Sequence, residues 1–174
     1  MRLFLAVDFS PAVKQTLCDV RDRLADAATA GRFTHRDNFH ITLAFLGEVP
    51  PSRVSAIRSC MNSIDCAPFS VTLQELGRFR RQGGDIWWMG LADCPELSAL
   101  AGQLSDALRQ RGFALEDRRF SPHVTLGRQV ILPREFRAFT PEPVEQQVTE
   151  VSLMQSERVG GRMVYTPLLK KFLK

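Results

Sequence analysis

The sequence has few of the residues that typically build metal, redox or disulfide sites. Its 174 residues include only three histidines, His35, His40 and His123. The chain has four cysteines: Cys18, Cys60, Cys66 and Cys94. No two of them have the CxxC spacing of a metal or redox motif. Four cysteines are also too few for a dense disulfide framework in a chain of this length. We therefore expect reduced thiols and a cytoplasmic protein.

Long apolar runs and a strong excess of one charge are missing as well. The apolar start of the chain, residues 1–7, is interrupted by Asp8 and is too short for a signal peptide or a membrane span. We expect a buried first strand there and no membrane partner. The 23 basic and 19 acidic residues give a net charge of +4. This balance permits an anionic partner such as nucleic acid but does not require one.

One short pattern, by contrast, occurs twice. The stretches His40-Ile41-Thr42-Leu43 and His123-Val124-Thr125-Leu126 both read His-x-Thr-Leu. Side chains alternate faces along a strand, so each copy places an imidazole and a hydroxyl on one face, about 7 Å apart along the strand, with apolar residues behind. Two such strands facing each other across a cleft would form a site with two histidines, two hydroxyls and no obvious nucleophile.

The spacing of apolar residues predicts an alternation of helices and strands. The three expected helices run from Pro11 to Gly31, from Ser52 to Pro68 and from Pro95 to about Gly112. Besides the two motif strands, we expect strands over residues 1–7, 69–75, 86–91, 147–155 and 162–169. A hairpin loop is expected at 80–85, a turn at 158–161 and a single helical turn within 133–139.

The distance from a helix-starting proline to the motif histidine is nearly the same in both halves. Pro11 precedes His40 by 29 residues, and Pro95 precedes His123 by 28. This match indicates one supersecondary unit used twice. We expect an α+β fold with pseudo-twofold symmetry, in which antiparallel sheets carry helices on their outer faces. Residues 1–174 would then form a single domain of two interwoven lobes, with one motif in each lobe.

Structural alternatives exist for each candidate side chain. A histidine on a strand face is usually a structural residue, but the repetition favours a functional role for His40 and His123. His35 has no threonine partner and no counterpart, so we expect it on the surface or in a loop. A metal site built from the three histidines lacks further ligands, because no Cys, Asp or Glu stands beside the motif histidines in ligand fashion.

Aromatic and basic residues offer weaker candidates for contacts with nucleic acid. Trp87 and Trp88 point to opposite faces of their strand, so one is expected in the core while the other could stack on a base. Phe9 is a second stacking candidate. The expected loops contain several arginines that are either solvated or in contact with a nucleic-acid backbone, namely Arg78, Arg80, Arg81, Arg118 and Arg119.

Two imidazoles suit the opening of a cyclic phosphodiester by water. The reaction needs a base for the proton of the water and an acid for the departing ribose oxygen, and imidazoles titrate near neutrality. The transition state gathers negative charge on the non-bridging oxygens, so donors must be directed there. The hydroxyls of Thr42 and Thr125 and the guanidinium of Arg128 are suitable donors.

Taken together, these motifs resemble the 2H phosphoesterase superfamily, and within it the RNA 2′,3′-cyclic phosphodiesterases, or LigT-type 2′,5′ RNA ligases. The resemblance extends from residues 4–8 through both motifs and Arg128 to residues 165–168. It implies a bilobal fold, no metal or cofactor, and hydrolysis of 2′,3′-cyclic phosphate ends to 2′-phosphates. It makes His40 the proton donor and His123 the proton acceptor, with Thr42, Thr125 and Arg128 binding phosphate.

The resemblance also implies the partners: RNA ends with a 2′,3′-cyclic phosphate, such as tRNA halves, and no obligate protein partner, so we expect a monomer. Reversal of the reaction would join RNA ends by a 2′,5′ linkage. Two alternatives stay open. The chain could be a non-catalytic RNA-binding module that keeps the phosphate pocket, or a phosphodiesterase acting on small cyclic phosphates or 2′,5′ oligonucleotides.

Overall fold

Two antiparallel sheets form the framework of the protein. The computed structural model describes residues 1–174. The first sheet has the strand order β3-β1-β8-β9, with β1 Arg2–Val7, β3 Ile41–Glu48, β8 Glu150–Val159 and β9 Arg162–Phe172. The second has the order β2-β6-β5-β4-β7, with β2 Ala30–Phe33, β4 Phe69–Phe79, β5 Asp85–Leu91, β6 His123–Ile131 and β7 Val144–Val148. The expected α+β class with antiparallel sheets is confirmed.

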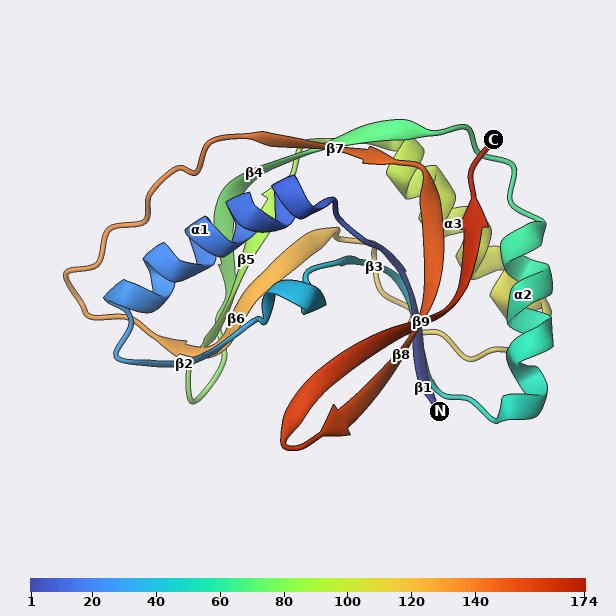
Figure 1. Cartoon of the computed structure of the whole chain (residues 1–174), viewed down its shortest axis with the longest axis horizontal. Helices are drawn as coiled ribbons and strands as arrows, with labels where there is room; N and C mark the ends of the chain where they lie inside the picture. Colours follow the sequence, from blue (N-terminus) through green and yellow to red (C-terminus); the bar gives the residue numbers. More distant parts are fainter.

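Helices α1 and α3 each pack against the sheet other than the one that they follow in the chain. Helix α1 (Pro11–Ala27) follows β1 of the first sheet but packs against β2, β6 and β7 of the second. Helix α3 (Pro95–Gln110) follows β5 of the second sheet but packs against β3 of the first, beside α2 (Val54–Asn62). Figure 1 shows α1 on one side of the molecule and α2 and α3 on the other. Helices α1 and α3 therefore each cover the sheet that carries the other half's motif. None of the helices is long and apolar enough to cross a membrane.

Each sheet buries one face and turns the other toward the middle of the molecule. In β1, Leu3 and Leu5 are fully buried in the main hydrophobic core. Phe4, between them, instead packs with Ala6, Met154 and the partly buried Tyr165 in a small separate cluster on the opposite face. The alternation of a strand thus separates the structural core from the face on which the site is built.

The structure corrects several expected boundaries in the first half of the chain. Helix α1 ends at Ala27, and the residues expected at its end form the short edge strand β2. Strand β2 has no apolar alternation and is defined by its pairing with β6. The second helix begins with a 3₁₀ turn, η2 (Pro51–Arg53), and α2 ends at Asn62, before Pro68.

The second half departs from expectation at three places. Strand β4 runs on to Phe79. It passes an irregularity at Glu75, which adopts a left-handed conformation (φ 68°) without ending the strand. Residues 133–139 contain no helix, only a turn in which the Phe136 N–H donates to the Pro133 carbonyl. The strand expected at 147–155 is two strands, since the chain leaves β7 of the second sheet and enters β8 of the first at Thr149.

The two motif strands contain the same bulge. In β3, Thr42 pairs with Ala6 and Ala44 pairs with Leu5, which leaves Leu43 without a partner. In β6, the register skips Leu126, because Thr125 pairs with Trp88 and Gly127 pairs with Trp87. An extra residue in one strand reverses which side chains face which way beyond it. Residues after the bulge therefore turn toward the site at positions that simple alternation assigns to the core.

Candidate active site

The motif side chains from both halves meet at one cavity of about 410 Å³ between the two sheets. All five residues expected from the sequence line it: His40, Thr42, His123, Thr125 and Arg128. The rest of the lining comes from both sheets and the adjoining segments, and comprises Arg2, Phe4, Thr34, Asn38, Phe45, Ser121, Ser156, Met163 and Tyr165. Strands far apart in the chain thus contribute to a single site.

His40 is held by hydrogen bonds at both ring nitrogens. Its Nδ1 lies 2.7 Å from the Asn38 carbonyl oxygen, and its Nε2 lies 2.9 Å from the Thr42 Oγ1. A carbonyl only accepts, so Nδ1 carries a proton and the neutral ring presents Nε2 as an acceptor. The rings of Phe4 and Tyr165 pack against the imidazole, with centroids at 4.9 and 5.2 Å. The histidine is therefore fixed in tautomer and orientation.

His123 has the corresponding arrangement in the other half. Its Nδ1 lies 2.8 Å from the carbonyl oxygen of Ser121, which again stands two residues earlier in the chain. Phe79 and Trp88 pack beside the ring, at centroid distances of 5.2 and 5.9 Å. No protein group bonds the Nε2 of His123, so this nitrogen is open to a ligand. In both histidines Nδ1 is bonded to a backbone carbonyl, which leaves Nε2 as the ring nitrogen that the backbone does not engage.

The hydroxyl of Thr42 lies much closer to its imidazole than the spacing along a strand suggests. The strand rise of about 7 Å separates the backbones of alternate residues, but the His40 ring leans along the strand and reaches Thr42 at 2.9 Å. Thr125 makes no corresponding bond with His123. The two copies therefore differ in how firmly the hydroxyl is engaged before a ligand binds.

Burial lowers the pKa of both imidazoles. For His40, desolvation is the largest cause, the nearby charges of Arg128 and His123 act in the same direction, and the Asn38 carbonyl and Asp8 oppose it. For His123, desolvation also dominates, assisted by Arg128 and Arg118 and opposed by the Ser121 carbonyl. Both rings are thus disposed toward the neutral form in the absence of an anionic ligand.

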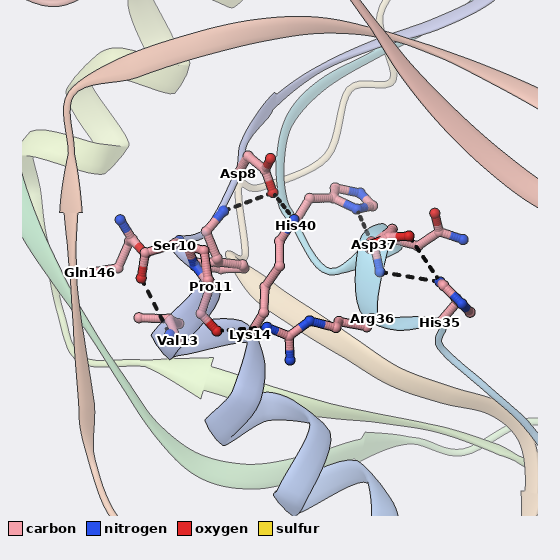
Figure 2. Close-up of polar contacts among 12 residues, drawn as sticks. Asp8, Ser10, Pro11, Val13, Lys14, His35, Arg36, Asp37, His40 and Gln146 are labelled. Atoms are coloured by element: carbon pink, nitrogen blue, oxygen red, sulfur yellow. Dashed lines mark hydrogen bonds and ion pairs between the residues drawn. The ribbon is translucent and has the colours of Figure 1, made fainter.

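Asp8 distinguishes the two histidines electrostatically. Its carboxylate accepts a hydrogen bond from the Phe9 N–H at 2.8 Å and forms an ion pair with Lys14 at 3.1 Å (Figure 2). It raises the pKa of His40, whereas no carboxylate acts on His123. Of the two imidazoles, only His40 has an acidic side chain that favours its protonated form.

Two arginines supply positive charge to the cavity, one from each half. Arg128 lies beyond the β6 bulge, and its charge lowers the pKa values of both histidines and of Tyr165, as expected for a group near all three. Arg2 stands over the ring of Phe45, with its guanidinium carbon 4.9 Å from the ring centroid. Neither guanidinium forms an ion pair with a carboxylate. Both are available to an anion.

Some residues of the cavity are not among the site residues expected from the sequence. Tyr165 lies on His40, and burial raises the pKa of its phenol, so the hydroxyl stays protonated and can donate. It is the one tyrosine of the chain, which was a usable signal. Arg2 and Asn38 enter the cavity from segments whose sequence shows only a strand and a polar connection. Their place in the site depends on the pairing of distant strands.

Other candidates lie outside the cavity. His35 is half exposed and accepts a hydrogen bond from the Asp37 N–H at the start of a short 3₁₀ helix, η1 (Arg36–Asn38). Phe9 and Trp87 are buried in the core, so the stacking role considered for Phe9 is wrong. Trp88 lies against His123 but does not line the cavity. No group of three or more His, Cys, Asp or Glu side chains is arranged to hold a metal ion.

The arginines expected in loops have varied surroundings. Arg78 belongs to strand β4 and pairs with Asp85 at 3.4 Å. Arg81 stacks over Phe79, with 5.6 Å between its guanidinium carbon and the ring centroid, and Arg118 pairs with Glu116. All of these side chains are exposed or at the surface, so their local contacts are those of solvated charges.

Comparison with known proteins identifies relatives that match most of the chain. The family model of the 2′-5′ RNA ligase superfamily matches residues 6–160. The chain is 33% identical over 172 residues to the RNA 2′,3′-cyclic phosphodiesterase of Escherichia coli (strain K12), a match that covers 96% of this chain and 93% of that protein. It is also 33% identical over 129 residues to the RNA 2′,3′-cyclic phosphodiesterase of Geobacillus stearothermophilus, which covers 72% of this chain but only 41% of that longer protein.

A solved structure of a related protein has the same fold as this chain. The crystal structure of E. coli LigT complexed with 3′-AMP has a TM-score of 0.87 to this chain at 31% identity, covering 99% of this chain and 97% of the other. The resemblance expected from the two His-x-Thr motifs is confirmed. With a family model that matches most of its length and a relative aligned along nearly all of it, this chain belongs to the 2′-5′ RNA ligase superfamily.

Proposed function

We propose that this protein hydrolyses the 2′,3′-cyclic phosphate ends of RNA to 2′-phosphates, without a metal or an organic cofactor. The main support is the pair of imidazoles, each with Nδ1 held by a backbone carbonyl, at a cavity that also contains Arg128. Relatives named RNA 2′,3′-cyclic phosphodiesterase match the chain along most of its length. A cleft with two positioned acid–base groups and an unpaired guanidinium suits a small phosphodiester.

In this reaction, a water molecule attacks the phosphorus atom of the cyclic phosphate. The Nε2 of His123 accepts a proton from the water as the new P–O bond forms. The bond between phosphorus and O3′ breaks, and the Nε2–H of His40 protonates the departing O3′. The phosphate stays on O2′, and the two imidazoles end the reaction with exchanged protonation states.

The assignment of acid and base follows the family pattern and has electrostatic support. The acid must be protonated before the reaction, and Asp8 raises the pKa of His40. The base must be neutral, and no carboxylate opposes the burial that lowers the pKa of His123. A bound cyclic phosphate adds a negative charge near both rings and raises both pKa values, which restores a protonated His40 in the complex.

Arg128, Thr42 and Thr125 would stabilise the charge that develops on the non-bridging oxygens. A guanidinium offers a planar pair of donors that fits two phosphate oxygens, and each hydroxyl adds one donor. Donors that are already in place when the charge develops are worth more than donors that must reorganise. Tyr165 and Arg2 stand close enough to the site to assist.

The same groups would support 2′,5′ ligation, in which an RNA hydroxyl takes the place of water. If the 5′-hydroxyl of a second RNA end replaces water as nucleophile, His123 deprotonates it, O3′ leaves, and a 2′,5′ phosphodiester forms. Microscopic reversibility then assigns the opposite roles to the two histidines when that linkage is broken. The name of the superfamily, 2′-5′ RNA ligase, supports this extension.

The test is incubation of the purified protein with a 5′-labelled oligoribonucleotide that ends in a 2′,3′-cyclic phosphate, in excess chelator and without nucleotide cofactor. We expect a product that ends in a 2′-phosphate. A 3′-phosphate product would overturn the proposed bond cleavage. Loss of turnover on chelation that a divalent ion restores would overturn the metal-independent mechanism, and an unchanged substrate would exclude the hydrolase in favour of a binding module.

A further inference from the structure

A second hollow adjoins the cavity that is lined by both motif histidines, which we call the catalytic cavity. Its volume is about 760 Å³, and it shares five lining residues with the catalytic cavity: Thr34, Asn38, Arg128, Met163 and Tyr165. It lies between β2, at the edge of the second sheet, and the tip of the β8–β9 hairpin, which projects from the body of the protein (Figure 1). The two hollows are therefore continuous, and we call the second one the arginine groove.

The arginine groove carries an unbalanced positive charge. Its lining contains five arginines, Arg21, Arg32, Arg128, Arg158 and Arg162, and a single carboxylate, Asp22. Asp22 pairs with Arg21 at 2.9 Å, and Arg21 also donates to the Thr34 carbonyl. The remaining four guanidiniums form no ion pair. An exposed hollow lined by unpaired arginines favours an anion of more than one charge.

Two of these arginines stand directly opposite each other. Arg32 of β2 and Arg128 of β6 are register partners in an antiparallel pair, and both are exposed. Like charges directly opposite each other on a sheet are unfavourable. An anion held between them would relieve the repulsion. This pair also marks the point where the groove meets the catalytic cavity, because Arg128 lines both.

The far wall of the groove is held in place by the body of the protein. The Asn38 side-chain amide donates to the Met163 carbonyl at 2.9 Å, which ties the β8–β9 hairpin to η1. Arg158 and Arg162 stand on either side of the hairpin turn, and Arg158 makes only a weak bond to the Gly161 carbonyl at 3.4 Å. Their charges are positioned by the hairpin but are not neutralised by it.

We propose that the arginine groove binds the phosphodiester backbone of the RNA strand whose cyclic end lies in the catalytic cavity. This inference rests on the proposed function and extends it from a terminal nucleotide to an oligonucleotide. Successive phosphates leave the catalytic cavity past Arg128 and Arg32 and continue toward Arg158 and Arg162. The half-exposed Met163 lies between the two hollows and offers an apolar surface to a ribose or a base.

A comparable hollow, lined by residues of β4, β5 and β6 and the loop that follows β6, provides the control. It is lined by Arg78, Arg81 and Arg134, but it shares no residue with the catalytic cavity, and Arg78 is paired with Asp85. Arg134 is exposed and forms no ion pair, as is true of Arg158. Replacing Arg134 removes the same charge at a site that the RNA strand would not reach.

The experiment compares adenosine 2′,3′-cyclic phosphate with a pentaribonucleotide that has the same cyclic end. In the parent protein we expect kcat/KM to be about tenfold or more higher for the pentanucleotide, because counterion release favours multiple phosphate contacts. The variant with both Arg158→Gln and Arg162→Gln should lose about ten- to thirtyfold on the pentanucleotide and less than about threefold on the mononucleotide. Arg134→Gln should leave the ratio of the two substrates as in the parent.

Two further readouts separate binding from a structural role. The slope of log kcat/KM against log salt concentration should become shallower by about 0.7 for each phosphate of the single strand that a variant no longer neutralises. Arg32→Gln should lower kcat/KM on the pentanucleotide without lowering the melting temperature, because it removes a like-charge pair. A lower melting temperature with an unchanged substrate ratio would assign Arg32 to the fold and overturn its place in the groove.

Failure of the groove and failure of the proposed function are distinguishable. Equal kcat/KM on the two substrates, unaffected by the groove variants, would overturn the groove and leave the hydrolase intact. If neither substrate is hydrolysed, the proposed function fails, and the groove is tested by fluorescence anisotropy with a 5′-labelled pentanucleotide ending in a 2′-phosphate. A Kd that the double variant weakens about tenfold would support the groove, and an unchanged Kd would overturn it.

Discussion

Phe45 and Arg128 occupy the same place in the two halves of the site. Each stands five residues after a motif histidine and two residues after the unpaired leucine of the bulge, and each lines the catalytic cavity. The first half carries an aromatic ring at this place with Arg2 stacked over it, and the second half carries the arginine itself. Each half of the chain therefore contributes one arginine to the cavity. Only Arg128 occupies the equivalent position, whereas Arg2 reaches the cavity from β1.

Arg128 is expected to contribute strongly to turnover. Replacing Arg128 with Ala should lower kcat/KM on adenosine 2′,3′-cyclic phosphate by roughly ten- to a thousandfold, because a preorganised donor to the phosphate oxygens is removed. Arg128→Lys should recover only part of the loss, since an ammonium keeps the charge but not the planar pair of donors. Steady-state kinetics with Arg134→Ala as a control would check this. Parent-like kinetics in Arg128→Ala would make the residue structural.

The pH dependence should differ between the free enzyme and its complex. Activity falls at low pH when His123 is protonated and at high pH when His40 is deprotonated, so the profile is bell-shaped with two macroscopic pKa values of a coupled pair. Burial lowers both pKa values from 6.5 in the free protein, so kcat/KM should be highest below pH 6.5. The bound anion raises both, so the limbs of kcat should lie at higher pH. Coincident profiles would contradict this.

The carboxylate of Asp8 should raise the pKa of His40, the proposed general acid. Replacing Asp8 with Asn keeps an acceptor for the Phe9 N–H but removes the charge that raises the pKa of His40. The alkaline limb of kcat/KM should then move to lower pH, while the acid limb, set mainly by His123, moves less. Asp37→Asn is the matched control, because Asp37 pairs with His35 outside the cavity. A general loss of activity without a shift of the alkaline limb would point to a structural role for Asp8.

The packing behind His123 depends on a glycine. A Cβ at Gly77 would lie 2.0 Å from the Trp88 ring, and Trp88 in turn packs against His123. We expect Gly77→Ala to lower the free energy of unfolding by about 1–3 kcal/mol through overpacking, and to reduce kcat by displacing the imidazole. Gly102→Ala, in α3 with open space around its Cβ, should instead stabilise by about 0.5–1 kcal/mol. Thermal unfolding of both variants would check the expected changes in stability, and steady-state kinetics would check the expected loss of kcat in Gly77→Ala.

The motif residues and the repeated unit could be predicted from the sequence because they depend on local patterns. The placement of His40 and Thr42 on one face follows from strand alternation. The placement of Arg128 does not, since alternation assigns it to the opposite face from His123, and only the bulge at Leu126 turns it toward the cavity. A bulge is set by pairing with a distant strand, and this pairing leaves no clear signal in the local sequence.

The edge strand β2 and the break between β7 and β8 could not be predicted for a related reason. Arg32 lies in a four-residue strand without apolar alternation, so only its pairing with Arg128 identifies it. The chain changes sheets at Thr149 within an otherwise continuous strand pattern. The arginine groove combines Arg32 of β2 with the hairpin of β8 and β9 from the other sheet, so it is a property of the tertiary structure.

The two-histidine mechanism is tested most directly by single-turnover hydrolysis of a cyclic-phosphate oligonucleotide with four proteins: the parent, His40→Ala, His123→Ala and the double variant. Circular dichroism should show the same fold in all four, because both imidazoles face the cavity. Each single substitution should slow the chemical step by roughly two to four orders of magnitude, and the double substitution should cost little more than either one, since both groups act in one event. Folded single variants that hydrolyse the cyclic phosphate at the parent rate would contradict the mechanism.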